Sequence, residues 1–432
     1  LELNNAIAAA NPHILEMLST LGREMYMPKG ILTQSAEAKQ QAHRYDATIG
    51  TAMEHGQAMN LPSVMASLKG LSPNDALLYA PAPGLMALRQ EWQRKTLVDN
   101  PDLQGKPMSL PVVTNGLTHG LSLVGDLFVE PGDVVLVPDM MWENYHLIFA
   151  VGRQAELRQF PFFKGSGLNL EGFRKALGEV CAERGKVVVL MNFPNNPTGY
   201  APSESEAREI AAALRAAAEG GANVVALVDD AYFGLFFEEQ VMKRSIFGQL
   251  AAAHPRLLAI KADAATKEAY VWGLRIGFLT FSTGGTAASD SPLYQALEKK
   301  VAGCIRAAVS NCSQLSQKVV LEALRHPDFM AQRSAKAAVL QARAAKVKEV
   351  LAQDRFDEAW TAYPFNSGYF MCLRLKRVNA EALRVHLLKD YGIGVIANND
   401  TDIRIAFSCL ELDQISDLFE LLLKAWRDLA GA

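Results

Sequence analysis

Short apolar runs alternate with helical stretches through the middle of the chain. Between about residues 112 and 281, segments rich in Val, Leu and Ile are separated by longer segments with the apolar spacing of helices. The pattern predicts strands at Val112–Thr114, Val134–Val137, Val187–Asn192, Val224–Asp229, Leu257–Lys261 and Ile276–Phe281. Short β-branched runs alternating with helices indicate an α/β fold in three layers, a mostly parallel sheet covered on both faces.

The pattern changes after about residue 325. A long helical stretch at 331–353, rich in Ala, Lys, Arg and Gln, is followed by mixed strands and helices. We therefore expect a large domain over 58–325 and a smaller α+β domain formed by 326–432 together with 1–57, which includes an N-terminal arm. The first 50 residues are expected to pack near the small domain without forming strands of their own.

The residues that follow the predicted strands carry reactive or ligand-binding groups. Ligands of open α/β sheets bind outside the carboxyl ends of the strands. An amine, Lys267, follows the strand at 257–261, and Arg275 comes eight residues later. An amine can form a Schiff base with a phosphorylated aldehyde, and a guanidinium can hold its phosphate. The other strands are followed by a carboxylate, a phenol, an amide, an indole and a helix start: Asp229, Tyr232, Asn196, Trp142 and Gly116–Thr118. Together these groups are the ones that pyridoxal 5′-phosphate requires.

Each residue also has an ordinary structural explanation. Asn-Pro and Thr-Gly pairs are common in turns, and an Asp at a strand end often caps a helix. Trp142 and Tyr232 are of types that fill cores, and Arg404, inside an apolar strand pattern, is of a type found at sheet edges. The joint occurrence of these residues at one sheet edge favours a cofactor site over separate structural roles.

The chain resembles the fold-type I pyridoxal-phosphate enzymes, specifically the class I/II aminotransferases of the aspartate, tyrosine and aromatic group. The resemblance rests on Asn196-Pro197-Thr198-Gly199, on Asp229-x-Ala231-Tyr232, on Lys267 with Arg275, and on Trp142 and Arg404. Order and spacing agree from about residue 45 to residue 407. The resemblance implies an enzyme that moves an amino group from an L-amino acid (aspartate, glutamate or aromatic) to a 2-oxo acid by a ping-pong mechanism.

The resemblance also implies a role for each residue at the cofactor ring. Lys267 would hold the cofactor as an aldimine and, once released by substrate, would move the substrate proton. Asp229 would pair with the pyridine nitrogen and keep it protonated, so that the ring can accept electrons. Tyr232 and Asn196 would donate to the ring oxygen, and Trp142 would stack on the ring. The Asn196–Pro197 bond is expected to be cis.

The phosphate and the substrate would be bound by further residues. The implied phosphate ligands are Gly116, Leu117, Thr118, Arg275 and, from a second subunit, Tyr79. Relatives usually place Ser or Thr where this chain has Ala264, so either Thr266 or Thr118 compensates or the cofactor binds less tightly. Arg404 would grip the substrate α-carboxylate near the Gly50 backbone. Arg306 of a neighbouring subunit would read a distal carboxylate, unless it is a solvated helix arginine.

Composition and charge narrow the classes of function. The formal net charge of −3 gives no electrostatic footprint for nucleic acid or an anionic membrane, and no apolar run is long enough to span a bilayer. The five cysteines show no metal-ligand spacing, so we expect no metal site and a reduced, cytoplasmic protein. Because Tyr79 and Arg306 make sense only in a partner's site, an obligate homodimer is expected.

Three alternatives remain to be compared with an aminotransferase. Another reaction of the same scaffold, such as that of a C–S β-lyase or a decarboxylase, would use the same Lys267 and Asp229. A transcriptional regulator with an aminotransferase-like domain would need a basic helix-turn-helix, but the segment before the sheet already holds Gly50 and Tyr79. A nicotinamide dehydrogenase would have GxGxxG after its first strand, which residues 115–120 lack.

Overall fold

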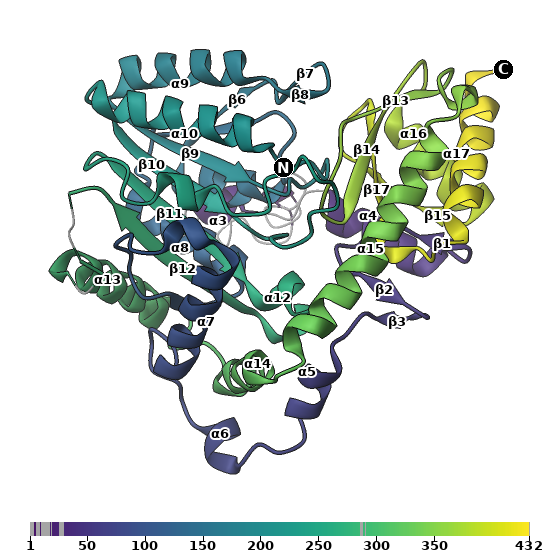
Figure 1. Cartoon of the computed structure of the whole chain (residues 1–432). Helices are drawn as coiled ribbons and strands as arrows, with labels where there is room; N and C mark the ends of the chain where they lie inside the picture. The colour runs from purple at the N-terminus through teal and green to yellow at the C-terminus, as the bar shows by residue number, and fades with distance from the viewer. Residues whose placement is uncertain are drawn as a thin grey trace.

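The fold is built on two β-sheets, the cores of the two domains that we propose (Figure 1). A computed structural model describes residues 4–5, 9, 18, 20–25, 30–285, 288–289 and 291–431. Most of the expected N-terminal arm therefore lies outside the described residues. Within the described part of the chain, no helix is long and apolar enough to cross a membrane.

The large sheet has seven strands in the order β4-β12-β11-β10-β9-β5-β6. Their bounds are β4 Val112–Asn115, β5 Val134–Pro138, β6 Glu156–Phe160, β9 Lys186–Asn192, β10 Asn223–Asp229, β11 Leu257–Ala264 and β12 Ile276–Thr283. Only β12 runs antiparallel to its neighbours, so the expected mostly parallel sheet is confirmed. All six predicted strands are present. Strand β6 was not predicted, because its half-exposed pattern Glu-Leu-Arg-Gln-Phe has no apolar run.

Both faces of this sheet are buried, as its apolar strands require. Alternate residues along a strand point to opposite faces. In β9, Val188 and Leu190 join one hydrophobic cluster while Val187, Val189 and Met191 join the other. Strands β5 and β10 divide their side chains in the same way. A continuous apolar run in the sequence therefore becomes a central strand between two cores.

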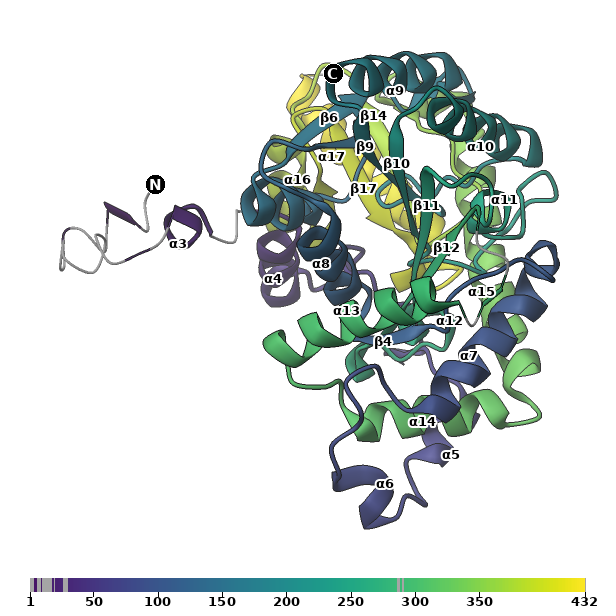
Figure 2. The ribbon, with the colours of Figure 1, turned by 90° about the vertical axis from the view of Figure 1, so that its left-hand side faces the viewer.

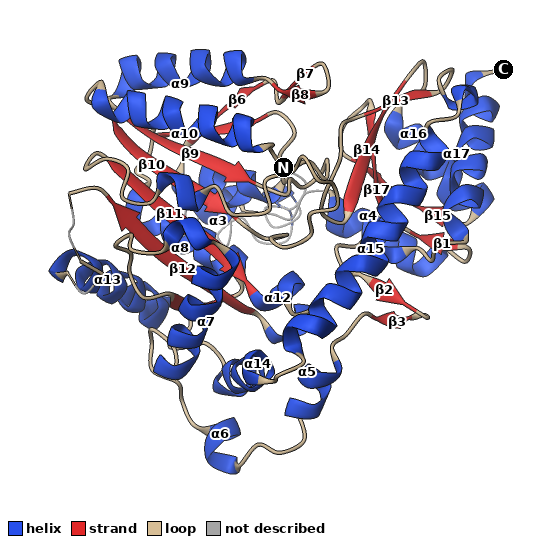
Figure 3. Cartoon of the chain, in the orientation of Figure 1, coloured by secondary structure: helices blue, strands red, loops and turns tan. Residues whose placement is uncertain are grey.

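Helices cover both faces of the large sheet (Figure 3). On one face lie α9 (Leu170–Arg184) and α10 (Glu204–Glu219). Helix α10 begins with a capping box, because Ser203 accepts from the Glu206 amide while the Glu206 carboxylate accepts from the Ser203 amide. On the other face lies α8 (Leu117–Phe128), which begins at the predicted helix start. The remaining helices of this part are α5 Pro62–Ser67, α6 Pro73–Leu77, α7 Met86–Asp99, α11 Phe247–Leu250, α12 Ala265–Glu268, α13 Pro292–Ala308 and α14 Gln314–Arg325.

The small sheet has the order β13-β14-β17-β16 and is entirely antiparallel. Its strands are β13 Trp360–Ala362, β14 Phe370–Leu375, β16 Ile396–Ala397 and β17 Asp402–Ala406. Helices α16 (Ala380–His386) and α17 (Gln414–Ala430) complete this α+β unit. The long helix α15 (Phe329–Leu351) runs from the large sheet to the small one (Figure 1).

One expectation for the first 50 residues is wrong. Helix α4 (Ile31–Gln41) packs against the small unit, as expected, but Tyr45–Asp46 forms a short strand, β1, that pairs with β15 (Ile393–Gly394). A short β-hairpin follows, from β2 (Met53–Glu54) and β3 (Gln57–Ala58). Two-residue strands carry too little pattern to be recognised in a sequence. The view in Figure 2 shows α4 beside α16.

A close backbone crossing joins the two sheets at Gly199. The carbonyl of Gly199 accepts hydrogen bonds from the Asn366 and Ser367 amides, at 3.0 and 2.9 Å. Its φ is +74°, and a Cβ there would lie 2.0 Å from the carbonyl oxygen of Phe370. A backbone atom cannot move aside as the end of a flexible side chain can, so only glycine fits.

We expect Gly199→Ala to lower the free energy of unfolding by more than about 2 kcal/mol, because it combines backbone strain with a clash. Gly221→Ala is the matched control, because Gly221 has φ +100° but open space around the added Cβ. The control should cost about 1 kcal/mol. Urea unfolding measures both, and equal losses for the two variants would contradict the proposed crossing constraint.

Candidate functional site

A cavity of about 260 Å³ opens at the carboxyl ends of the central strands, between the large sheet and the small one. The structure brings ten of the predicted residues into its wall: Gly50, Leu117, Thr118, Trp142, Asn196, Asp229, Tyr232, Lys267, Arg275 and Arg404. These residues are separated by up to 354 positions in the chain, from 50 to 404. We call this space the site cavity.

Lys267 lies in the four-residue helix α12, which begins where strand β11 ends. Its Nζ is 4.4 Å from the centroid of the Tyr232 ring. Burial lowers the pKa of this amine to about 8; Asp229 opposes that shift and Arg275 adds to it. The amine is thus neutral in a much larger fraction of molecules near pH 8 than an exposed lysine, which is the form that attacks an aldehyde.

Asp229 ends strand β10 and is held by groups that the sequence analysis missed. The Tyr145 hydroxyl donates to its Oδ2 at 2.6 Å, and the Asn192 amide donates to its Oδ1 at 3.2 Å. Burial raises the pKa of Asp229, while the hydrogen bond from Tyr145 lowers it. A cation against this carboxylate, such as a pyridinium, would lower the pKa further. Tyr145 follows Trp142 by three residues, and nothing in that spacing signals a carboxylate partner.

The phosphate-binding residues implied by the sequence meet at the start of α8. Gly116 has φ +79°, and a Cβ there would lie 2.4 Å from Nη2 of Arg275. A Cβ on Gly277, in the neighbouring strand β12, would lie 2.6 Å from the Gly116 carbonyl carbon. The two glycines therefore allow the guanidinium to approach the amide groups that begin α8. A helix start with an adjacent arginine is well suited to a phosphate.

Besides the Nε of Arg404, two buried hydrogen-bond donors in the cavity wall have no partner within the described residues. They are the Thr266 hydroxyl and the Trp272 indole N–H. A buried donor without an acceptor is costly, so such groups indicate a missing polar ligand. Thr266 is one of the two residues expected to compensate for Ala264, which is itself buried at the end of β11. Trp272 was not predicted. The donor set, the glycine cradle and the amine with its lowered pKa fit the pyridoxal phosphate implied by the sequence.

Arg404 enters the site cavity from strand β17. It donates through Nη1 to Asn196 Oδ1 at 3.0 Å and through Nη2 to the Thr48 carbonyl at 2.8 Å. Its guanidinium carbon lies 4.2 Å from the centroid of the Phe370 ring, and its Nε has no partner within the described residues. No carboxylate of the described residues forms an ion pair with this buried guanidinium, so a substrate carboxylate would supply its counter-ion.

Asn196 and Gly50 also line the site cavity. Because Asn196 accepts from Arg404, its NH₂ group is the part that can donate to a ligand. The Asn196–Pro197 bond is cis, as expected, and the Phe193–Pro194 bond is cis as well. A Cβ on Gly50 would lie 3.4 Å from Cζ of Phe370 and 3.5 Å from the Tyr232 hydroxyl. Gly50 therefore borders the space between these two rings.

Tyr79 and Arg306 are not in the wall of the cavity formed by this chain. Tyr79 is 89% exposed, next to the exposed Leu77 and Leu78 after α6. Arg306 lies in the last turn of α13, where it is exposed and donates to the Ser310 hydroxyl. Trp142 is half-buried in the cavity wall, with its ring 5.5 Å from that of Tyr145 in an edge-on arrangement.

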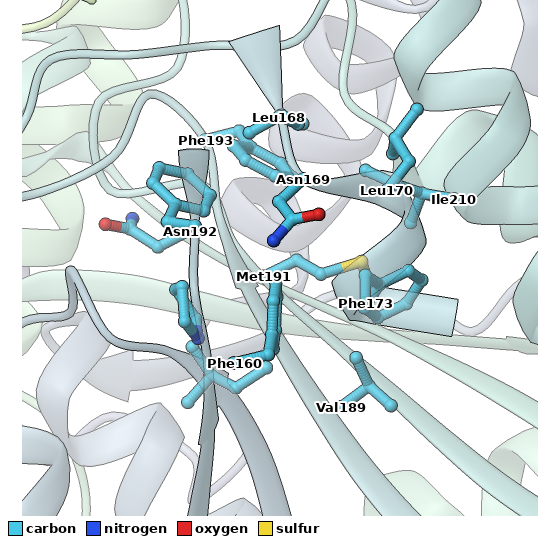
Figure 4. Close-up of a pocket in the computed structure, with 13 residues that line it drawn as sticks. Phe160, Leu168, Asn169, Leu170, Phe173, Val189, Met191, Asn192, Phe193 and Ile210 are labelled. Carbon is cyan, nitrogen blue, oxygen red and sulfur yellow. The ribbon is translucent and has the colours of Figure 1, made fainter. Parts of the chain in front are cut away.

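A second cavity lies behind strand β9 and is apolar (Figure 4). It measures only about 30 Å³, and its walls are mainly aromatic and aliphatic side chains such as Phe160, Phe173 and Met191. Figure 4 shows the Asn192 amide on the far side of the strand from Met191. Because successive side chains of a strand point to opposite faces, Asn192 points to the site cavity and Met191 points to the core. Asn169, which caps α9, and Asn192 also line this cavity, but its volume is too small for a cofactor.

Comparisons with known proteins agree with this geometry. Residues 50–422 match the family model described as aminotransferase class I and II. A probable aspartate/prephenate aminotransferase of Aquifex aeolicus is 26% identical over 58% of this chain and 57% of its own length. This chain therefore matches little more than half of that relative.

Solved structures resemble the whole fold. An aminotransferase of Anaerococcus prevotii has a TM-score of 0.82 and 21% identity, over 94% of this chain and 98% of that one. A kynurenine aminotransferase of Pyrococcus horikoshii, in complex with pyridoxamine phosphate (PMP), has a TM-score of 0.79 and 17% identity, over 96% and 98%. At these identities the likeness shows the fold alone.

The low pKa of Lys267 predicts how its reaction with pyridoxal phosphate depends on pH. The neutral amine is the nucleophile, so attachment should speed up as pH rises and level off above about 8, not above the ordinary lysine value of 10.5. Borohydride trapping of the cofactor on cofactor-free protein measures the rate. Lys267→Ala gives the background from other lysines, and a rate still rising through pH 10 would contradict the assignment.

Proposed function

This chain belongs to the aminotransferase class I and II family, and we propose that it transfers the amino group of an L-amino acid to a 2-oxo acid. Members of this family use pyridoxal phosphate. The observation that carries the proposal is the buried Lys267 amine, which shares one cavity with the Asp229 carboxylate and the Arg275 guanidinium. Few other reactions need a neutral amine, a buried carboxylate and an anion-binding helix start together.

Each end of the cofactor would be held by different residues of this chain. Arg275, Thr266 and the start of α8 would bind the phosphate, and Trp142 would cover one face of the ring. Asp229 would bind the ring nitrogen, held in place by Tyr145 and Asn192. The bound cofactor supplies an electron sink for the substrate Cα.

The substrate would be oriented by Arg404 and deprotonated by Lys267. Arg404 is already fixed by Asn196 and by the Thr48 carbonyl, so it can bind a carboxylate without losing further side-chain freedom. The Lys267 amine, with its pKa near 8, can accept the Cα proton and return it at neutral pH. Ile49, Gly50 and Phe370 would border the substrate on the small-sheet side.

A second copy of the chain would complete the site. The exposed Leu77, Leu78 and Tyr79 form an apolar segment at the end of the molecule where α6 lies, and Arg306 is exposed on α13. We propose a homodimer in which Tyr79 reaches the partner's phosphate and Arg306 reaches the partner's substrate. Aspartate, glutamate or an aromatic amino acid would be the donor. All five cysteines are free thiols, which supports a cytoplasmic location.

The covalent role of Lys267 is tested by trapping. Purified protein loaded with pyridoxal phosphate should be yellow, lose that absorbance with a donor amino acid and regain it with a 2-oxo acid. Borohydride reduction should fix the cofactor on the peptide that contains Lys267. Lys267→Arg keeps the positive charge but should abolish both trapping and transamination, by at least about a thousandfold. Trapping at another lysine would refute the proposal.

Arg306 is tested by comparing two classes of amino donor. If it binds a distal carboxylate, Arg306→Ala should raise KM for aspartate and glutamate by about tenfold or more, while KM for apolar donors changes little. Lys300→Ala removes an exposed cation from the same helix and is the matched control. An equal change for both donor classes would assign Arg306 to the solvated surface.

A further inference from the structure

A buried cluster of four charged side chains lies directly behind the lysine helix α12. We call it the ion cluster; it consists of Lys95 on α7, the adjacent Asp99, Glu268 on α12 and Arg333 on α15. Lys95 bridges to Asp99 at 2.7 Å and also to Glu268 Oε2. Arg333 reaches Asp99 and the same Glu268 oxygen, each at 3.4 Å. The Glu268 carboxylate on α12 thus pairs with side chains of two other helices, α7 and α15.

The ion cluster is deeply buried and electrically balanced. The four side chains are between 1% and 11% exposed, and Glu268 is the most buried of them. Two cations face two anions, so each charge taken from water has a partner. Removal of one partner from such a group leaves an uncompensated buried charge, whereas removal of an oppositely charged pair does not.

Glu268 is the residue that follows Lys267. Helix α12 has only four residues, Ala265–Glu268, so its own hydrogen bonds fix its orientation weakly. Lys267 lines the site cavity whereas Glu268 does not, so the two side chains leave the helix in different directions. The bridges of Glu268 to Lys95 and Arg333 therefore anchor the side of α12 that faces away from the amine.

The ion cluster also supports the segment that follows strand β10. Lys95 Nζ lies 5.7 Å from the centroid of the Phe233 ring. A Cβ on Gly234, which has φ +86°, would lie 2.1 Å from Nη2 of Arg333. Phe233 and Gly234 directly follow Tyr232, whose ring contacts the Lys267 amine. The ion cluster therefore contacts both segments that meet at the Lys267 amine. One is α12, which carries Lys267, and the other is the segment after β10, which carries Tyr232.

Helix α15 connects the ion cluster to the substrate side of the cavity. Ten residues after Arg333, Arg343 donates to the carbonyls of Met53 and Ser408 and pairs with Glu411. Met53 follows the segment that contains Gly50, and Ser408 follows strand β17, which carries Arg404. The same helix is therefore bound to the lysine helix at one point and to the substrate-binding segments at another.

We propose that Glu268 is a positioning residue for the amine of Lys267, held by Lys95 and Arg333. This inference rests on the covalent role proposed for Lys267. Glu268 does not touch the cofactor or the substrate; it sets where α12 presents the amine relative to Asp229, Tyr232 and Arg275. Its partner Arg333 makes helix α15 part of the same support.

Single and paired substitutions test this proposal. Glu268→Gln keeps the side-chain shape but leaves the ion cluster with one excess positive charge, and Arg333→Met leaves it with one excess negative charge. Each should weaken binding of pyridoxal phosphate to the cofactor-free protein by about tenfold. The double variant restores the balance and should recover to within about threefold of the unchanged protein. Lys346→Met, which removes a cation that pairs with Glu349 on the same helix, is the control.

Two further measurements separate positioning from general stability. The pH midpoint of the visible absorbance of the loaded protein should shift in both single variants and return in the double variant, because it reports the surroundings of the linked amine. Urea unfolding shows whether each variant is folded. A lowered urea midpoint with unchanged binding and an unchanged absorbance midpoint would overturn the proposal, as would losses that simply multiply in the double variant. Failure of the unchanged protein to trap cofactor at Lys267 would instead refute the proposed function, and this inference with it.

Discussion

The register of the central parallel strands determines where the residues of the site cavity lie. Asp229 at the end of β10 pairs with Asn192 of β9 on one side and with Ala262 of β11 on the other. All three strands run in the same direction, so their carboxyl ends form one row and the residues that follow them meet above it. The hydrogen bond from Asn192 to Asp229 results from that row. A shift by one residue would turn Asp229 toward the opposite face and disperse the site.

Four buried cations around the site are stabilised in three different ways. Burial lowers the pKa of Lys267 to about 8, so this amine loses its proton more readily than an exposed lysine. Arg404 cannot lose its proton readily and is instead held by an amide, a carbonyl and an aromatic ring. Lys95 and Arg333 are matched with carboxylates. The groups left without a full counter-ion are those that face the cavity, where a ligand supplies it. The charges of Lys95 and Arg333 are thus paired within the protein. Those of Lys267 and Arg404 face the cavity and would be paired by a bound ligand.

The sequence predicted the central strands well because they are buried on both faces, and burial on both faces leaves a continuous apolar run. It predicted ten residues of the cavity because each follows such a strand or matches a family motif. It did not reveal Tyr145, Asn192 or Trp272, because a hydrogen bond between distant side chains leaves no periodic signal. It missed β1 and β6 for a related reason: one strand is too short for a pattern, and the other lies at a half-exposed edge.

The two arginines of α15 also set a limit on how this helix can vary. Arg333 and Arg343 point to different targets, and their relative direction is fixed by the ten residues between them. An α-helix has 3.6 residues per turn, so one inserted or deleted residue would rotate Arg343 by about 100° relative to Arg333. Surface side chains along this stretch can change freely, whereas its length cannot. The number of residues between Arg333 and Arg343, rather than their identity, therefore sets how the lysine helix and the substrate-binding segments are aligned.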